Sequence, residues 1–214
     1  MTGKDAGKSL LENAYALSTP DDNVAYYRSF AATYDSDFAD GMGWNYPAAV
    51  ARAYYASANQ GDLPIADIGC GTGFVAQELG LAPEVVDGMD ISPEMLRVAA
   101  GKGLYRDLYE VDLSGSLTAI ANDYGAVLSA GTFTHGHLGP GPLRGLLSIA
   151  RTGALFIIGV NKVHYEALEF STVLNELAGN KAIDAVRVDE VKMYSKPDHE
   201  HSDDTALLLT YRKL

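Results

Sequence analysis

The sequence has little cysteine and little positive charge, and each shortage excludes a class of protein. Its 214 residues include one cysteine, Cys70, so no disulfide can form within the chain. Lysine and arginine number 16 against 28 aspartates and glutamates, which gives a formal net charge of -12. Such a chain repels phosphate backbones and anionic membranes over long range. We therefore expect neither a nucleic-acid nor a membrane partner, and we favour small or cationic ligands.

Long apolar runs are also missing. No run approaches the roughly 18 residues of a membrane span. The N-terminus, Met1-Thr2-Gly3-Lys4-Asp5, opens no apolar signal-peptide core. We expect a soluble, cytoplasmic protein. Apolar residues make up 47% of the chain and charged residues 21%, a globular composition that can bury a sizeable core at this length.

The N-terminal part of the chain is rich in aromatic residues and has helical patterns. Pro20-Asp21-Asp22 can start a helix, and residues 48–58 predict another, with Pro47 in its first turn. We expect residues 1–60 to form a helical cap or lid. Tyr26 and Tyr27 within it are expected to pack against the sheet. The second domain would then span residues 61–214.

From residue 63 onward, short apolar runs alternate with helical patterns. The runs predict strands at 65–68, 84–89, 108–111, 126–129 and 154–160. Helices are expected at 72–79, from 93 to the glycines at 101 and 103, at 142–151 and at 164–178. Two alternating strands, 186–194 and 205–212, suit an antiparallel hairpin. The predicted fold is a Rossmann-like, doubly wound α/β sheet of seven mostly parallel strands, with an N-terminal helical extension.

A glycine-rich loop, Gly69-Cys70-Gly71-Thr72-Gly73, follows the first strand. Glycines let a backbone turn sharply and approach a ligand, and ligands of such sheets bind at the carboxyl ends of the strands. Three successive strands end in an acid: Asp67, Asp90 and Asp112. Asp90 could accept hydrogen bonds from two ribose hydroxyls, and Asp112 from an adenine amino group. The residues that could sandwich an adenine ring are Ile91, Met95 and Leu113.

Two other kinds of nucleotide-binding site have motifs similar to parts of this sequence. The segment from Gly71 to Ala76 matches the dinucleotide pattern G-x-G-x-x-G/A, with Asp90 19 residues after Gly71. However, a carboxylate just before the glycines, Asp67, is unfavourable beside a pyrophosphate, and Asp112 adds another. S-adenosylmethionine has no phosphate and carries an amino group, so it suits an acidic site better. A P-loop at Gly3 to Ser9 is excluded, because the motif needs glycine where Thr2 stands. A purely structural turn stays open.

These residues resemble the class I S-adenosylmethionine-dependent methyltransferase superfamily over roughly residues 34 to 214. The resemblance implies that the loop approaches the methionine part of the donor, that Asp90 binds ribose, and that Asp112 and Leu113 meet adenine. Tyr34 of the Tyr34-Asp35 pair is expected near the cofactor. The resemblance therefore implies S-adenosyl-L-methionine as the cofactor, with S-adenosyl-L-homocysteine as product. The predicted cofactor contacts are Tyr34, Asp67, Gly69, Cys70, Gly71, Gly73, Asp90, Ile91, Met95, Asp112, Leu113 and Ser129.

A narrower resemblance concerns four short segments. Tyr34-Asp35-Ser36-Asp37, Gly103-Leu104-Tyr105, Ser129-Ala130-Gly131 and Tyr211-Arg212-Lys213 look like the methyltransferase-like group from the Williams–Beuren chromosomal region. This resemblance supplies no substrate.

The segment from Ser129 to His137 faces the methyl acceptor in the superfamily. It lacks the Asn/Asp-Pro-Pro-aromatic signature used for exocyclic amines of bases and for glutamine. His135 and His137 could serve as catalytic base or substrate contacts, because histidine titrates near neutral pH; exposed loop histidines are the alternative. Residues 161–165 are another possible wall of the pocket. The polar loop 198–204 lacks a second cluster, so we expect no metal.

The predicted function is in-line transfer of a methyl group from S-adenosylmethionine to a small molecule. Alternatives are a protein methyltransferase and a catalytically silent S-adenosylmethionine-binding module that acts through partners. The expected partner is a small-molecule methyl acceptor, and the expected assembly is a monomer or homodimer.

Overall fold

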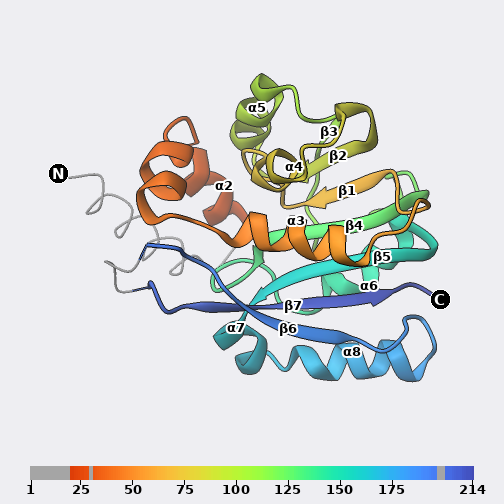
Figure 1. Ribbon diagram of the computed structural model, residues 1–214. Helices are drawn as coiled ribbons and strands as arrows, with labels where there is room; N and C mark the ends of the chain where they lie inside the picture. The colour runs from red at the N-terminus through yellow and green to blue at the C-terminus, as the bar shows by residue number, and fades with distance from the viewer. Residues whose placement is uncertain (1–19, 29–30, 197–200) are drawn as a thin grey trace.

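A seven-stranded sheet forms the centre of the computed structural model, which describes residues 20–28, 31–196 and 201–214 (Figure 1). Its order is β3-β2-β1-β4-β5-β7-β6. β1 to β5 are parallel, whereas β7 is antiparallel to both β5 and β6. The predicted doubly wound, mostly parallel sheet with a terminal antiparallel hairpin is confirmed. The strands are Ile65–Ile68 (β1), Val86–Asp90 (β2), Leu108–Glu110 (β3), Tyr124–Phe133 (β4), Ala150–Asn161 (β5), Arg187–Lys192 (β6) and Thr205–Arg212 (β7).

Helices cover both faces of the sheet. Ile65 of β1 packs into a core with α3 and α4, whereas its neighbour Ala66 packs into a second core with α6 and α8. Successive strand residues point to opposite faces, so a sheet covered on both sides needs apolar residues at consecutive positions. The helices are Pro20–Arg28 (α2), Tyr46–Ser57 (α3), Phe74–Leu79 (α4), Pro93–Lys102 (α5), Pro142–Leu146 (α6), Lys162–Ala167 (α7) and Phe170–Gly179 (α8).

Several predicted boundaries are wrong. β4 continues beyond residue 129, because Phe133 still pairs with Val160 of β5. β5 begins at Ala150, so the helix predicted over 142–151 ends early, and a 3-10 turn, Leu147–Ile149, follows it. The predicted start of β2 lies in another 3-10 turn, Pro83–Val85.

The single helix predicted over residues 164–178 is two helices. Glu169 separates α7 from α8 and has a φ of 51°, a left-handed conformation that a continuous helix does not contain. The apolar periodicity runs across this break, so the sequence pattern does not reveal it.

The two described helices of the N-terminal segment, α2 and α3, lie at different places on the sheet. α3 crosses the front of the sheet in Figure 1, whereas α2 lies beyond the arrowheads of β1, β4 and β5. Arg28 at the end of α2 forms an ion pair with Glu94 of α5, with 3.3 Å between its Nε and the carboxylate. A π-helical turn, Asp35–Asp40, lies between α2 and α3. The division of the chain at residue 60 stays a prediction.

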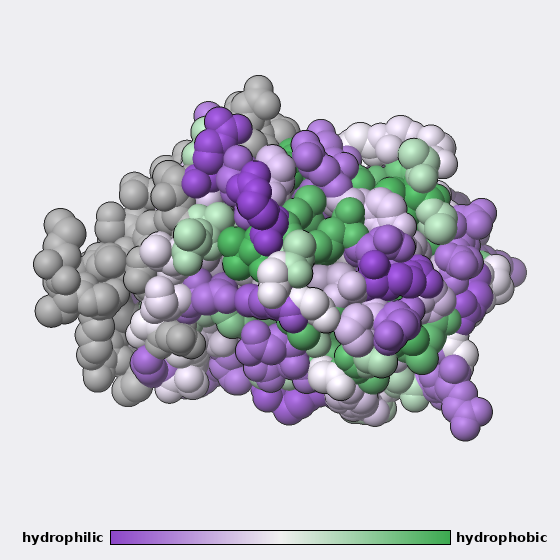
Figure 2. All heavy atoms as spheres, turned by 90° about the horizontal axis from the view of Figure 1, so that it is seen from above, coloured by the Kyte–Doolittle hydropathy of each residue, from purple (hydrophilic) through white to green (hydrophobic). Residues whose placement is uncertain are grey.

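The surface mixes polar and apolar residues, as the view from above shows (Figure 2). The exposed large apolar side chains come from different elements and loops: Tyr55, Leu63, Val163, Leu168, Val188 and Leu214. Scattered exposure of this kind is normal for a globular protein. Among the residues that the structure describes, no helix is long and apolar enough to cross a membrane.

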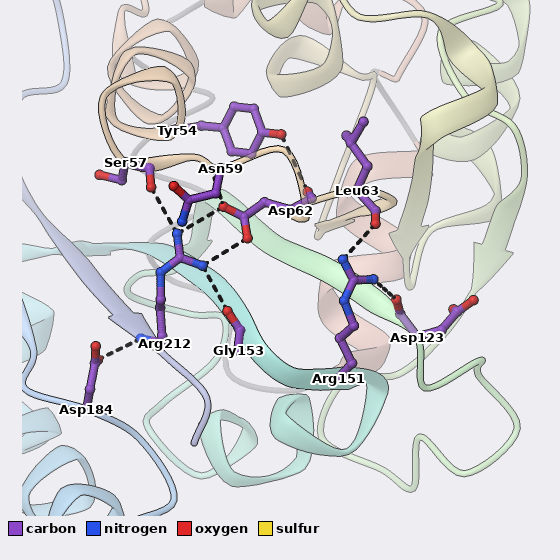
Figure 3. A network of polar contacts seen from close by, with 10 residues as sticks. All are labelled: Tyr54, Ser57, Asn59, Asp62, Leu63, Asp123, Arg151, Gly153, Asp184 and Arg212. Carbon is purple, nitrogen blue, oxygen red and sulfur yellow. Dashed lines mark hydrogen bonds and ion pairs between the residues drawn. The ribbon is translucent and has the colours of Figure 1, made fainter.

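A polar network closes the end of the sheet where the parallel strands begin (Figure 3). The guanidinium of Arg212 donates one hydrogen bond to each carboxylate oxygen of Asp62, both at 2.9 Å. It also donates to the carbonyl oxygens of Ser57, at the end of α3, and Gly153, in β5. Burial favours the neutral acid, but the hydrogen bonds and charge of Arg212 outweigh it and lower the pKa of Asp62. Arg212 therefore joins β7, α3 and β5 at one point.

Candidate functional site

The glycine loop lies where β1 and β2 end side by side, next to β4. Ile68 of β1 pairs with Met89 of β2, and Asp67 pairs with Leu128 of β4. Gly69, Gly71 and Gly73 all have positive φ, at 63°, 53° and 97°. A side chain at Gly69 would also collide with Thr132 of β4. Glycine is required there for both conformation and space.

Asp90, the predicted ribose ligand, holds this loop at its other side. Its Oδ2 accepts a hydrogen bond from the backbone N–H of Gly71, and its Oδ1 accepts one from Ser92, both at 2.8 Å. Burial raises the pKa of Asp90, and these backbone hydrogen bonds oppose the rise. Each carboxylate oxygen has two lone pairs, so each can accept a further hydrogen bond from a ligand.

Asp67, another of the three predicted acids, lies inside the protein. It has no exposed surface, and its Oδ2 accepts a hydrogen bond at 2.7 Å from the hydroxyl of Tyr105. Burial raises the pKa of Asp67 to about 7, against the effect of that hydrogen bond. Tyr105 belongs to a segment of the narrower family resemblance, but the sequence indicates no role for it in the site.

Cys70 and Ser129 also face inward. Burial raises the pKa of the Cys70 thiol well above its usual value, which makes the thiolate, the reactive form, scarce. The Ser129 hydroxyl donates to the carbonyl of Ile68 at 2.8 Å, so it joins β4 to β1. Neither side chain is exposed on the surface of the loop.

The residues predicted around adenine follow β2 and β3. Asp112 is exposed, and its Oδ1 accepts hydrogen bonds from the backbone and hydroxyl of Ser114 at 2.8 and 2.6 Å. Ile91 is half-buried, whereas Met95 and Leu113 are buried. Ser92 caps α5 by accepting a hydrogen bond from the Met95 backbone, as its place before Pro93 predicts.

Tyr34 lies close to the start of α4, next to the glycine loop. Its ring centroid is 6.5 Å from that of Phe74, 6.2 Å from that of Trp44 and 6.2 Å from that of Tyr27. Burial raises the pKa of Tyr34 well above its usual value. These contacts place Tyr34 beside Phe74, the first residue of α4 after the glycine loop.

The next residue, Asp35, binds the loop and α5 directly. Its Oδ1 accepts a hydrogen bond from the Thr72 hydroxyl at 2.6 Å, and its Oδ2 lies 2.6 Å from Nζ of Lys102. Lys102 also lies over the ring of Phe74, 4.6 Å from its centroid. The N-terminal segment is thereby attached to the glycine loop.

His137 forms a hydrogen bond with Tyr27 beyond the end of β4, in the segment predicted to face a methyl acceptor. The hydroxyl of Tyr27 is 2.8 Å from Nε2 of His137, and Nδ1 of His137 is 3.0 Å from the carbonyl oxygen of His135. A carbonyl can only accept, so Nδ1 carries the proton of the neutral ring, and Nε2 accepts from Tyr27. Burial lowers the pKa of His137, which favours this neutral form.

A third histidine, His164, joins the two that the sequence indicated. Its ring centroid lies 5.1 Å from that of His135, and its Nε2 lies 3.0 Å from the carbonyl oxygen of Leu138. Burial lowers the pKa of His164. The sequence indicates His164 only through its position after β5, in the segment 161–165 that could form a wall of the pocket. Among the described residues, no group of three potential ligands could hold a metal, and residues 198–200 of the polar loop lie outside them.

Comparisons with known proteins agree with this architecture. Residues 65–153 match the family model of a methyltransferase domain. A TehB-like S-adenosylmethionine-dependent methyltransferase from Corynebacterium glutamicum is 18% identical, with a TM-score of 0.53 over 91% of this chain and 98% of its own. An S-adenosylmethionine-dependent methyltransferase from Mesorhizobium loti is 19% identical, with a TM-score of 0.53 over 76% of this chain and 95% of its own.

A structure with a different named activity shares the fold. The 4+2 cyclase SpnF is 15% identical, with a TM-score of 0.65 over 92% of this chain and 97% of its own. At such identities, the likeness shows a common fold. No protein with a curated description matches the sequence.

Proposed function

Because residues 65–153 match a methyltransferase domain, we propose that the chain transfers the methyl group of S-adenosylmethionine, the donor, to a small molecule. The donor supplies an activated methyl group on its sulfonium sulfur. The chain's own task is then to hold donor and acceptor in line, since proximity and orientation lower the barrier.

The glycine loop fits such a donor. A Cβ at Gly71 would meet no described atom within 4 Å, so the loop is open on that side. Asp90 is hydrogen-bonded to the same residue and keeps lone pairs for ribose hydroxyls. We propose that the loop approaches the methionine part, that Asp90 binds ribose, that Asp112 meets adenine, and that Tyr34 closes the site near Phe74.

The hydrogen bond between Tyr27 and His137 carries the proposal for the acceptor. Ring contacts connect this pair to Tyr34 and, through it, to Phe74 beside the glycine loop. An acceptor O–H or N–H could therefore lose its proton to the oxygen of Tyr27 while the Tyr27 proton passes to Nε2 of His137. Such a relay leaves a neutral tyrosine and a protonated histidine. A pair of uncharged hydrogen-bonding groups suits a small polar acceptor.

The test separates donor binding from methyl transfer. We expect S-adenosylhomocysteine to bind the full chain in titration calorimetry, and labelled S-adenosylmethionine to methylate members of a metabolite panel but not a peptide panel. Transfer to peptides alone would favour a protein methyltransferase. Absence of product binding would contradict the proposed site.

A catalytically silent binding module is the second candidate. A protein of the same fold is named for a cyclase activity, so the fold by itself does not require methyl transfer. Donor binding without transfer to any acceptor would favour this candidate. The narrower likeness to the Williams–Beuren-region group is also a proposal, supported by the segments around Tyr34, Tyr105 and Ser129.

A further inference from the structure

Tyr105 lies beneath the glycine loop and connects it to two strands. It follows α5, and its side chain is half-buried. Its hydroxyl donates to Oδ2 of Asp67 at the end of β1, 2.7 Å away. Burial of Asp67 is complete, so this phenol is a partner that water cannot readily replace.

Two glycines leave the space that the Tyr105 ring fills. A Cβ at Gly73, in the loop, would lie 3.1 Å from Cε2 of Tyr105. A Cβ at Gly88, in β2, would lie 3.1 Å from Cε1 of the same ring and 2.9 Å from Sγ of Cys70. The ring is therefore packed between the loop and β2, while its hydroxyl reaches β1.

We propose that Tyr105 and Asp67 form a positioning pair that holds the glycine loop in its donor-binding shape. The inference rests on the proposed placement of the donor on this loop. Tyr105 does not touch the donor in this arrangement. It acts through its hydrogen bond to Asp67 and its packing against Gly73.

The charge state of Asp67 makes the pair testable. Burial raises the pKa of Asp67 to about 7, the charge of Asp90 on β2 adds to the rise, and the Tyr105 hydroxyl and the Ala76 backbone N–H of α4 oppose it. The Cys70 thiol of the loop is also near Asp67. An ionised Asp67 attracts the positively charged amino group of the donor, whereas a neutral one does not.

The experiment titrates the full chain with S-adenosylhomocysteine at several pH values from 6 to 8.5. Wild-type affinity is expected to rise with pH as Asp67 ionises. Tyr105→Phe keeps the ring but removes the hydroxyl that donates a hydrogen bond to Asp67. The pH at which affinity for the product rises should therefore move upward. We expect about a tenfold weaker affinity at pH 7, the order of effect of one hydrogen bond to a charged group, and recovery near pH 8.5.

Asp67→Asn tests whether Tyr105 acts through this carboxylate. We expect it to weaken binding and to remove the rise in affinity across neutral pH. Adding Tyr105→Phe to Asp67→Asn should then cause little further loss. An equal loss at every pH, also present in the Asp67→Asn background, would reduce Tyr105 to a packing residue and overturn the inference.

Tyr124→Phe is the matched control. The Tyr124 hydroxyl donates to Oδ2 of buried Asp87 at 2.6 Å, a bond of the same kind on the same sheet. Arg106 also donates to Asp87, at 2.9 and 2.6 Å, so that carboxylate keeps hydrogen-bond partners when the Tyr124 hydroxyl is removed. We expect wild-type affinity and pH dependence from this control. If the wild type binds the product and Tyr105→Phe shows the same dependence of affinity on pH, the positioning pair is overturned and the donor site is not. If the wild type binds no product, the donor site is overturned as well.

Discussion

The hydroxyl of Tyr27 lies 2.8 Å from Nε2 of His137, although 110 residues separate the two along the chain. This hydrogen bond joins α2 to the segment after β4, so the N-terminal extension reaches the residues predicted to face a methyl acceptor. Tyr27 was expected only to pack against the sheet. Its contact with the half-buried His137 makes the extension part of the candidate site.

Replacing His137 with glutamine should reduce turnover while leaving donor affinity unchanged. Glutamine can still hydrogen-bond but cannot take a proton, and loss of a general base costs about 10²- to 10⁴-fold. Because burial lowers the pKa of His137, wild-type turnover should fall only when the pH drops below the usual histidine range. Steady-state rates between pH 5 and 8 would measure this. Tyr27→Phe should also slow turnover, and wild-type rates in both variants would remove the pair from the mechanism.

Replacing Asp90 with alanine should weaken donor binding. The substitution removes the carboxylate that is proposed to accept hydrogen bonds from ribose. Such charge-assisted hydrogen bonds are worth about 1.5 to 3 kcal/mol, or roughly 10- to 150-fold in affinity. Asp189→Ala, on the exposed strand β6, serves as the control. Calorimetry with S-adenosylhomocysteine gives the affinities. Asp90 also holds Gly71, so unfolding curves must show that the variant is folded; unchanged affinity in a folded variant would mean that ribose lies elsewhere.

Replacing Asp35 with asparagine should speed release of the donor. The change weakens the ion pair with Lys102 and the contact with Thr72, which attach the N-terminal segment to the loop. Since the pair is partly exposed, we expect at most about 1 kcal/mol, or about a fivefold faster dissociation. Stopped-flow fluorescence can follow the release. Glu190→Gln breaks the exposed pair with Lys162 instead and should leave the rate unchanged; equal rates in both variants would count against an attached lid.

Replacing Asp62 with asparagine should destabilise the fold without changing donor affinity at fixed pH. Asp62 is almost fully buried and binds Arg212 with both oxygens, so we expect a loss of about 2 kcal/mol at pH 7. The folded-state pKa of Asp62 is lowered, so its contribution is complete above the ordinary aspartate range and is lost as the pH falls through the folded value. Denaturant unfolding from pH 3 to 7 measures both effects. A variant as sensitive to acid as the wild type would contradict the assignment.

The sequence predicts the sheet and the glycine loop well, because both depend on local patterns. Apolar runs define β1 and β5, and Ser92-Pro93 defines the start of α5. The end of β4 was missed because Phe133 belongs to the strand through its partner Val160, and no local pattern records a partner. Long-range pairing therefore set the boundaries that the sequence misplaced.

The contacts of the candidate site were harder to predict than its acids. Asp90 could be placed at the end of β2 from spacing alone. The partners Tyr105 of Asp67 and Tyr27 of His137 come from segments 38 and 110 residues away. Only the folded chain determines which polar group each of these tyrosines meets.

The position of β7 between β5 and β6 affects how the fold assembles. β6 lies at the edge of the sheet, and most of its residues are exposed. Its backbone pairs with β7, which in turn pairs with β5, so β6 cannot add to the sheet before β7 has docked. In native-state hydrogen exchange, opening of β7 must therefore release β6 as well, whereas β6 can open alone. The amides of β6 should exchange no more slowly than the β7 amides that bind β5.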